Sequence, residues 1–254
     1  MTLKRALITG ASSGIGQATA LRLANEGMDL VLLARRKDRL ESLKKQIESE
    51  HKVKVILIEG DVRDYEGLEK AFAAKASDID ACDVLINNAG LASGTGKMSE
   101  IKPQEWDDMI DTNVKGLIAL TRLLMPKFLQ ANRGHIVNIG SVAGRWVYPG
   151  GAVYCGTKFA VRAITDALRM EMIGTPIRVT NIEPGMVETE FSVVRLQDER
   201  KAKAVYQGME PLLADDIADC IAWSLSRPPR VNIQELVIFP TDQVGVGPAY
   251  VHRR

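Results

Sequence analysis

The sequence has little that would support a disulfide framework, a metal site or a strongly charged binding surface. Its three cysteines, Cys82, Cys155 and Cys220, are odd in number and scattered, which argues against a disulfide framework and favours a reducing cytoplasm. Its three histidines show no ligand spacing, so we expect no catalytic metal. The formal net charge of +1 gives no electrostatic reason to expect nucleic acid or a membrane surface as a partner.

Long apolar runs and processing signals are also missing. No apolar run approaches the ~20 residues of a membrane span, and the first residues enter a predicted strand at once, so we expect no signal peptide. Hydrophobic residues make up 46% and charged residues 26%, which is ordinary for a globular protein. A chain of 254 residues fits one α/β domain better than two.

Apolar strands alternate with helices along the chain. Strands are expected at 3–9, 29–34, 53–59, 83–86, 135–139, 177–182 and 231–239, and helices at about 14–26, 37–50, 103–131 in two parts, 153–173 and 215–225. This alternation predicts a Rossmann-type, doubly wound parallel sheet of seven strands with helices on both faces, in a single domain over residues 1–240. Residues 186–210 show mixed charge without a clean period, so we expect a mobile segment that covers the substrate. Residues 241–254 are interpreted as a tail that can contact a neighbouring subunit.

The first predicted strand runs into a glycine-rich turn. Gly10, Gly14 and Gly16 have the spacing G-x-x-x-G-x-G and lead into a helix. Glycine lets the backbone approach a pyrophosphate, and a helix N-terminus supplies N–H donors and partial positive charge. A glycine cluster can also be a plain tight turn, but the order strand, turn, helix favours dinucleotide binding.

The second predicted strand ends without the acid that would select NAD. Its last residue is Ala34, at the place where an acidic residue would bind the ribose 2′-hydroxyl of NAD. Arg35 and Arg36 follow and can grip a 2′-phosphate, so NADP(H) is the predicted cofactor. The alternative is that the two arginines merely open a solvated helix.

The stretch from Asn138 to Lys158 carries the predicted reaction chemistry. Tyr154 and Lys158 are four residues apart on a predicted helix, so their side chains share one face, and the positive charge is expected to lower the pKa of the tyrosine. Ser141 follows a strand end and can hydrogen-bond the same substrate oxygen. Each part has a plainer alternative, since Tyr–Lys pairs of this spacing are common on surfaces and Ser141 can be only a turn residue.

Other polar residues also follow predicted strand ends. Gly10, Asp61, Asn88, Ser141 and Pro184 lie just beyond such ends, where an open α/β sheet binds its ligand. Asn113 interrupts an apolar helical run, which indicates a polar role or simple tolerance.

Together these motifs resemble the short-chain dehydrogenase/reductase family over about residues 3–240. TGASSGIG at 9–16 is similar to its cofactor motif and NNAG at 87–90 to its structural turn. Asn113, Ser141, Tyr154 and Lys158 match its catalytic tetrad, and Pro184 and Gly185 with Thr189 match its nicotinamide-side motif. Segments such as LLARR and YPGGAVYCGTKFAVR resemble the NADP-dependent 3-hydroxy acid dehydrogenase and sulfoacetaldehyde reductase branch.

The resemblance implies roles for individual residues. Tyr154 is expected to be the general acid/base, Lys158 to hold the nicotinamide ribose, Ser141 to orient the substrate oxygen, and Asn113 to position a water in a proton relay. It also implies a homotetramer or homodimer. The implied cofactor-binding residues are Gly10, Ser12, Ser13, Gly14, Ile15, Gly16, Arg35, Arg36, Asp61, Val62, Asn88, Ala89, Gly90, Tyr154, Lys158, Pro184, Gly185, Val187 and Thr189.

The substrate is expected to be a small anionic aldehyde or the matching alcohol. Arg145 and Tyr148 lie just after Ser141, and Arg195 lies in the segment after Thr189. They can bind a carboxylate or sulfonate, with Arg195 the first candidate. The two arginines can instead be solvated surface charges. A neutral sugar, steroid or acyl ketone is the alternative substrate, and an NADP-sensing protein without turnover is the alternative of another class.

Overall fold

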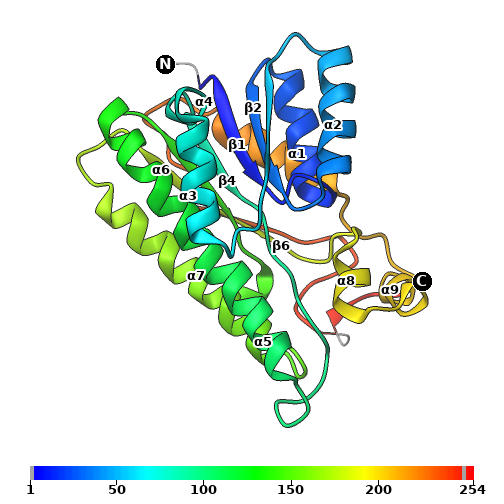
Figure 1. Ribbon diagram of the computed structural model, residues 1–254. Helices are drawn as coiled ribbons and strands as arrows, with labels where there is room; N and C mark the ends of the chain where they lie inside the picture. Colours follow the sequence, from blue (N-terminus) through cyan, green and yellow to red (C-terminus); the bar gives the residue numbers. More distant parts are fainter. Residues whose placement is uncertain (1–2, 248–249) are drawn as a thin grey trace.

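The computed structural model describes residues 3–247 and 250–254, and its strands form one parallel sheet (Figure 1). Within these residues the order is β3-β2-β1-β4-β5-β6-β7, so it reverses direction between β1 and β4. This confirms the predicted doubly wound, seven-stranded sheet. The strands are β1 Arg5–Thr9, β2 Asp29–Ala34, β3 Val55–Glu59, β4 Val84–Asn87, β5 His135–Ile139, β6 Arg178–Pro184 and β7 Glu235–Ile238.

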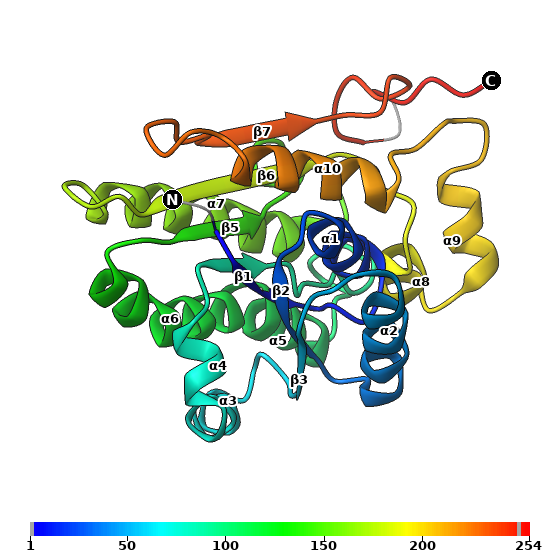
Figure 2. The ribbon, with the colours of Figure 1, turned by 90° about the horizontal axis from the view of Figure 1, so that it is seen from above.

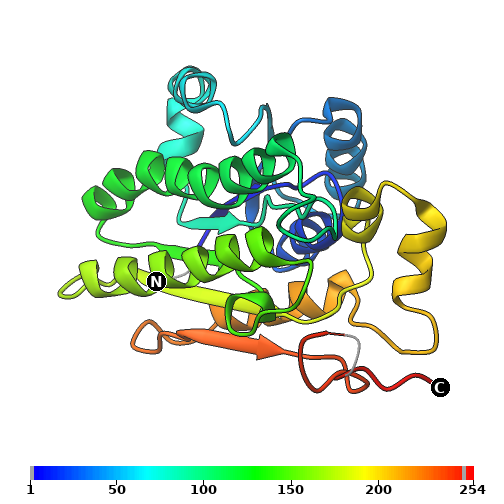
Figure 3. The same ribbon diagram turned by 90° about the horizontal axis from the view of Figure 1, so that it is seen from below.

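Helices cover both faces of the sheet (Figures 2 and 3). One core packs the sheet against Leu23 of α1, Leu40 of α2 and Ile221 of α10, and the other packs it against Phe72 of α3 and Phe128 of α6. The helices are α1 Gly14–Asn25, α2 Lys37–Glu50, α3 Tyr65–Ala74, α4 Ala76–Asp80, α5 Pro103–Ile110, α6 Leu117–Ala131, α7 Ala152–Glu171, α8 Phe191–Leu196, α9 Glu199–Val205 and α10 Ala214–Leu225. In the part of the chain that the structure describes, no helix is long and apolar enough to cross a membrane.

The central strands are buried on both faces. Every residue of β4, β5 and β6 is buried, as expected for central strands covered by helices on both faces. Because all strands are parallel, their carboxyl ends meet at one edge of the sheet. The residues that follow those ends are therefore brought together.

Besides element ends that shift by one or two residues, the structure differs from the sequence prediction in three places. The last strand begins at Glu235 rather than near 231, since β6 side chains bind the preceding backbone: Thr180 donates to the carbonyl of Ile233 at 2.7 Å. Helices α3 and α4, within residues 65–80, were not anticipated. Residues 186–210 contain α8 and α9, and Asp198 caps α9 by accepting from the backbone N–H groups of Arg200 and Lys201.

The C-terminal tail lies against the turn that follows α9 (Figures 1 and 3). The backbone N–H of Arg254 donates to the carbonyl of Gly208 at 2.6 Å, and its guanidinium donates to Asp242 at 3.1 Å. Arg253 donates to the carbonyl of Val205 at 3.2 Å. The tail thus contacts the covering segment of its own chain, and its contact with a neighbouring subunit stays a prediction.

Candidate active site

Most of the predicted site residues line one cavity of ≈ 330 Å³ at the carboxyl edge of the sheet. It lies where the strand order reverses, the position expected for a ligand in an open α/β sheet. Asn113, Arg145, Tyr148, Arg195 and Gly16 do not line it. The predicted residues that do are Gly10, Ser12, Ser13, Gly14, Ile15, Arg35, Arg36, Asp61, Val62, Asn88, Ala89, Gly90, Ser141, Tyr154, Lys158, Pro184, Gly185, Val187 and Thr189.

The glycine turn after β1 has a backbone that requires glycine. Gly10 and Gly14 have φ of 64° and 53°, in the left-handed region that other residues adopt at a cost. A Cβ on Gly16 would lie 2.5 Å from the carbonyl oxygen of Gly10 and from the side-chain nitrogen of Asn88. Helix α1 starts at Gly14, so its first N–H groups, which have no partner inside the helix, lie at the cavity. This arrangement suits a pyrophosphate.

Asn88 and Thr9 tie the ends of β1 and β4 together. The Asn88 amide donates to the carbonyl of Thr9 at 2.9 Å, and the Thr9 hydroxyl accepts from the N–H groups of Asn88 at 3.0 Å and Ala89 at 2.9 Å. Thr9 opens the TGASSGIG motif, but its hydroxyl was not predicted to join the two strand ends. Its position as the last residue of a strand, next to the glycine turn, was the sequence feature that could have indicated this role.

Arg36 lies over the glycine turn, whereas Arg35 points more into solvent. The Arg36 guanidinium donates to the hydroxyls of Ser12 at 3.2 Å and Ser13 at 2.7 Å. Arg35 is 66% exposed and lies 3.9 Å from Asp61. Arg36 with its two serines therefore forms a cationic, hydroxyl-rich corner of the cavity that fits a 2′-phosphate.

The reaction groups gather at the end of β5. Ser141 follows β5, and Lys158 of α7 donates to the carbonyl of Ile139 at 2.8 Å. The Lys158 nitrogen lies 5.9 Å from the ring centroid of Tyr154. The Tyr154 ring packs against Phe191 of α8, with ring centroids 5.7 Å apart. A hydroxyl, a phenol and an amine thus meet beside the cavity, as the four-residue helical spacing predicted.

The sequence predicted that Lys158 lowers the pKa of Tyr154, and the structure shows a pKa shift in the other direction. Burial raises the pKa of Tyr154 above its ordinary value, and the interaction with the Ser141 hydroxyl only partly opposes this shift. The Lys158 ammonium bonds to a backbone carbonyl instead, and burial lowers the pKa of Lys158 to about 8. Near neutral pH, Tyr154 is therefore an uncharged phenol that can donate a proton.

Asn113 lies in a π-helical segment, Asp111–Gly116, between α5 and α6. Its side-chain oxygen accepts from the N–H of Leu91 at 2.8 Å, and its nitrogen donates to the carbonyl of Leu91 at 2.8 Å and to the hydroxyl of Thr157 at 3.0 Å. The polar residue in this apolar run therefore holds the loop after β4 against α7. Its expected role in a water relay stays a prediction.

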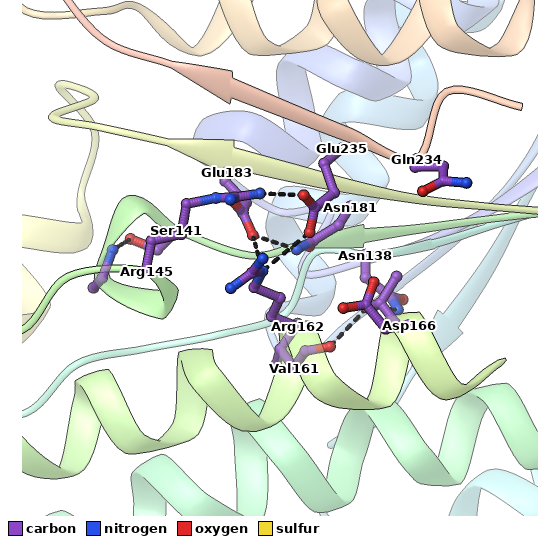
Figure 4. Close-up of polar contacts among 12 residues, drawn as sticks. Asn138, Ser141, Arg145, Val161, Arg162, Asp166, Asn181, Glu183, Gln234 and Glu235 are labelled. Atoms are coloured by element: carbon purple, nitrogen blue, oxygen red, sulfur yellow. Dashed lines mark hydrogen bonds and ion pairs between the residues drawn. The ribbon is translucent and has the colours of Figure 1, made fainter. Parts of the chain in front are cut away.

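Arg145 does not reach the cavity, so its expected role as an anion ligand is corrected. Its guanidinium pairs with Glu183, which is fully buried, and with Glu235 (Figure 4). Arg162 pairs with Glu235 at 3.0 Å and lies 3.9 Å from Glu183. Two carboxylates and two guanidiniums thus form a neutral cluster behind the site, because the chain turns away after Gly144.

Arg195 and Tyr148, by contrast, lie beside the reaction groups. The Arg195 guanidinium lies 5.4 Å from the centroid of the Tyr148 ring and donates to the carbonyl of Gly94 at 3.2 Å. Arg195 and Tyr154 both line a second, much smaller cavity. Burial raises the pKa of Tyr148 and the charge of Arg195 opposes that shift, which reflects their proximity.

A model of the short chain dehydrogenase family matches residues 4–200. An NADP-dependent 3-hydroxy acid dehydrogenase of Schizosaccharomyces pombe is 45% identical over 249 residues, which are 97% of this chain and 96% of the relative. A serine 3-dehydrogenase of Agrobacterium fabrum is 41% identical, with 95% of each chain covered. A sulfoacetaldehyde reductase of Chromohalobacter salexigens is also 41% identical, with 93% of each covered.

A solved structure with a closely similar fold is the closed form of a serine dehydrogenase complexed with NADP+. It superposes with a TM-score of 0.91 at 39% identity, over 98% of this chain and 100% of that one.

Proposed function

Because the chain belongs to the short-chain dehydrogenase family, we propose that it interconverts a small anionic aldehyde and the corresponding alcohol. The chain is an NADP-dependent oxidoreductase. The proposed substrates are 3-hydroxy acids such as serine or 3-hydroxypropionate with their semialdehydes, or the pair sulfoacetaldehyde and isethionate. In each of these the reacting carbon lies close to a permanent negative charge.

The cavity has the features that NADP(H) requires. A Cβ at Gly16 would collide with the backbone of Gly10, and Arg36 with Ser12 and Ser13 can hold the 2′-phosphate. Thr189 lies over the glycine turn, since a Cβ at Gly14 would come within 3.3 Å of it. When bound, the cofactor supplies the hydride that reduces the carbonyl carbon.

Tyr154 is the proposed proton donor to the carbonyl oxygen. Its raised pKa keeps the proton on the phenol before reaction, and Ser141 orients the same substrate oxygen. Lys158, with a pKa of about 8, is mostly charged at neutral pH, so it stabilises the phenolate left after transfer. Asn113 keeps the loop at Leu91 in place beside these groups.

The location of Arg195 carries the proposal of an anionic substrate. Arg195 comes from α8, yet it lines the small cavity together with Tyr154. Its Nε atom donates to the carbonyl of Gly94, which fixes the guanidinium beside Tyr148. Tyr148 lies under the same guanidinium and can add a hydroxyl donor.

The two alternatives receive less support. The position of Arg195 beside Tyr154 favours a charged substrate over a neutral sugar, steroid or acyl ketone. A sensor of NADP would not require Ser141, Tyr154 and Lys158 to meet at the cavity.

The proposal is tested by comparing an anionic and a neutral aldehyde of similar size, with NADPH as cofactor. In Arg195→Ala, we expect KM to rise roughly tenfold or more for malonic semialdehyde or sulfoacetaldehyde, as for loss of a charge-assisted bond, and KM for propanal to change little. Arg200→Ala is the matched control, because Arg200 is exposed in neighbouring α9. Equal KM changes for both aldehydes would exclude Arg195 as the anion ligand.

A homo-oligomer and a cytoplasmic location are further parts of the proposal. Large apolar side chains are exposed on α6 and on and just after α7, among them Ile118, Phe159, Met170 and Ile173. Such side chains support association through the two long helices. Light scattering of the wild type and of Met170→Glu would show whether this face joins subunits.

A further inference from the structure

Glu190 bridges the mouth of the cofactor cavity. It follows Thr189 at the start of α8, and its carboxylate accepts from Arg36 at 3.0 Å and from Arg39 at 2.6 Å. These two arginines flank the start of α2, more than 150 residues earlier in the chain. The hydrogen bonds from Arg39 and then Arg36 lower the pKa of Glu190, so it is charged at neutral pH.

The arginine that Glu190 binds is the one placed to bind a 2′-phosphate. Each nitrogen of Arg36 already has one partner: Nε donates to Ser12, one Nη to Ser13 and the other Nη to Glu190. A carboxylate and a phosphate use the same donors of a guanidinium. A 2′-phosphate bound at Arg36 would therefore lie beside the carboxylate of Glu190, and the two negative charges repel each other.

We infer that Glu190 sets cofactor specificity by competing with the 2′-phosphate of NADP(H) for Arg36. The inference rests on the proposed binding of the 2′-phosphate by Arg36. NADP(H) must either displace the carboxylate from Arg36 or bind beside its negative charge, whereas NAD(H) leaves the Glu190–Arg36 pair intact. Glu190 therefore weakens NADP(H) binding selectively, although the fold as a whole prefers this cofactor.

The competition also involves the covering segment. Glu190 directly precedes α8, which carries Phe191 and Arg195 to the reaction groups. The 2′-phosphate of a bound cofactor would therefore meet this segment at Glu190.

The test is a pair of matched charge removals on one segment. Glu190→Gln is compared with Glu188→Gln, since Glu188 is exposed, does not line the cavity and lies two residues away. Dissociation constants for NADPH and NADH are measured from nicotinamide fluorescence, and those for adenosine 2′,5′-bisphosphate by calorimetry. We expect Glu190→Gln to bind NADPH and the bisphosphate about three- to tenfold more tightly, as for two partly exposed ion pairs. NADH binding should change by less than about twofold, and Glu188→Gln should match the wild type.

A double-mutant cycle with Arg36→Gln locates the effect. If Glu190 acts through Arg36, Glu190→Gln should change NADPH affinity by less than about twofold in the Arg36→Gln background. Unchanged or weaker NADPH binding in Glu190→Gln would overturn the inference, and so would the same gain in Glu188→Gln or in the Arg36→Gln background. If the proposed binding of the 2′-phosphate by Arg36 is itself wrong, the result is different: the wild type would then bind NADPH no better than NADH.

Discussion

Replacing Arg145 by methionine removes the cation that compensates the buried carboxylate of Glu183. Methionine retains much of the apolar stem, so the loss is mainly one of charge. Glu183 is fully buried, and Arg145 is its direct ion partner, 20% exposed at the side chain. Arg162 lies 3.9 Å away and is already paired with Glu235, so it can compensate only in part.

The expected destabilisation is about 3 kcal/mol at neutral pH, the lower end for breaking a buried pair by removing one partner. Asn181 still donates to Glu183 at 2.6 Å, which favours the lower end of the range. Most of the loss comes from an uncompensated buried charge and not from lost packing. Removing that charge as well, in Arg145→Met with Glu183→Gln, should restore about half of the lost stability or more.

The pH dependence has a definite sign. Burial raises the pKa of Glu183 above its ordinary value of 4.5, although Arg145 opposes the shift. Without Arg145 the folded-state pKa rises further, so the folded protein holds this proton more tightly than the unfolded chain does. Below the pKa that Glu183 has in the unfolded chain, its charge costs the folded state nothing. The cost in folding free energy appears as pH rises through the higher pKa of the folded state. The variant should therefore lose less stability at about pH 5 than at about pH 8.

The assay is urea unfolding followed by circular dichroism, at one protomer concentration because association contributes to apparent stability. Wild type, Arg145→Met, Glu183→Gln and the double variant are compared at both pH values. KM is also measured with an anionic and a neutral aldehyde, and Arg145→Met should change the two KM values to the same extent. A loss below about 1 kcal/mol at both pH values, without rescue in the double variant, would refute the role of this cluster.

Three further predictions concern the site. Tyr154→Phe should lose at least ~10² in kcat while NADPH affinity stays near that of the wild type, and near-normal turnover would contradict its role as proton donor. Gly16→Ala should abolish NADPH binding or folding, because the new Cβ would lie 2.5 Å from the Gly10 carbonyl, and fluorescence titration with thermal melting separates the two results. Burial lowers the pKa of Lys158 from 10.5 to about 8 in the folded protein. Below about pH 8 the buried positive charge therefore reduces the free energy of unfolding, and this cost disappears as pH rises to 10.5. Between pH 8 and 10.5 the free energy of unfolding of the wild type should rise by roughly 3 kcal/mol relative to that of Lys158→Met. If the free energies of the two proteins change in parallel with pH, the lowered pKa of Lys158 is contradicted.

Local patterns in the sequence were enough to predict the sheet and most of the cofactor cavity. Alternating apolar segments produced the seven parallel strands, and the bounds of β2, α2 and β5 agree with those predicted. The spacing from Gly10 to Gly16 reflects a backbone shape that the turn itself imposes. Tyr154 and Lys158 meet because a helix places residues four apart on one face. Each of these features depends on a few neighbouring residues.

Tertiary structure alone decided which charges reach the site and how they titrate. Arg145 is four residues from Ser141 yet turns to Glu183, whereas Arg195 arrives from a distant helix and is held by Gly94. Glu190 meets Arg36 across 154 positions of the chain. The pKa of Tyr154 rises because of the groups that bury it, and the spacing to Lys158 carries no information about them. The partner of a charge and the solvation of a phenol depend on packing between distant segments, which no local pattern in the sequence encodes.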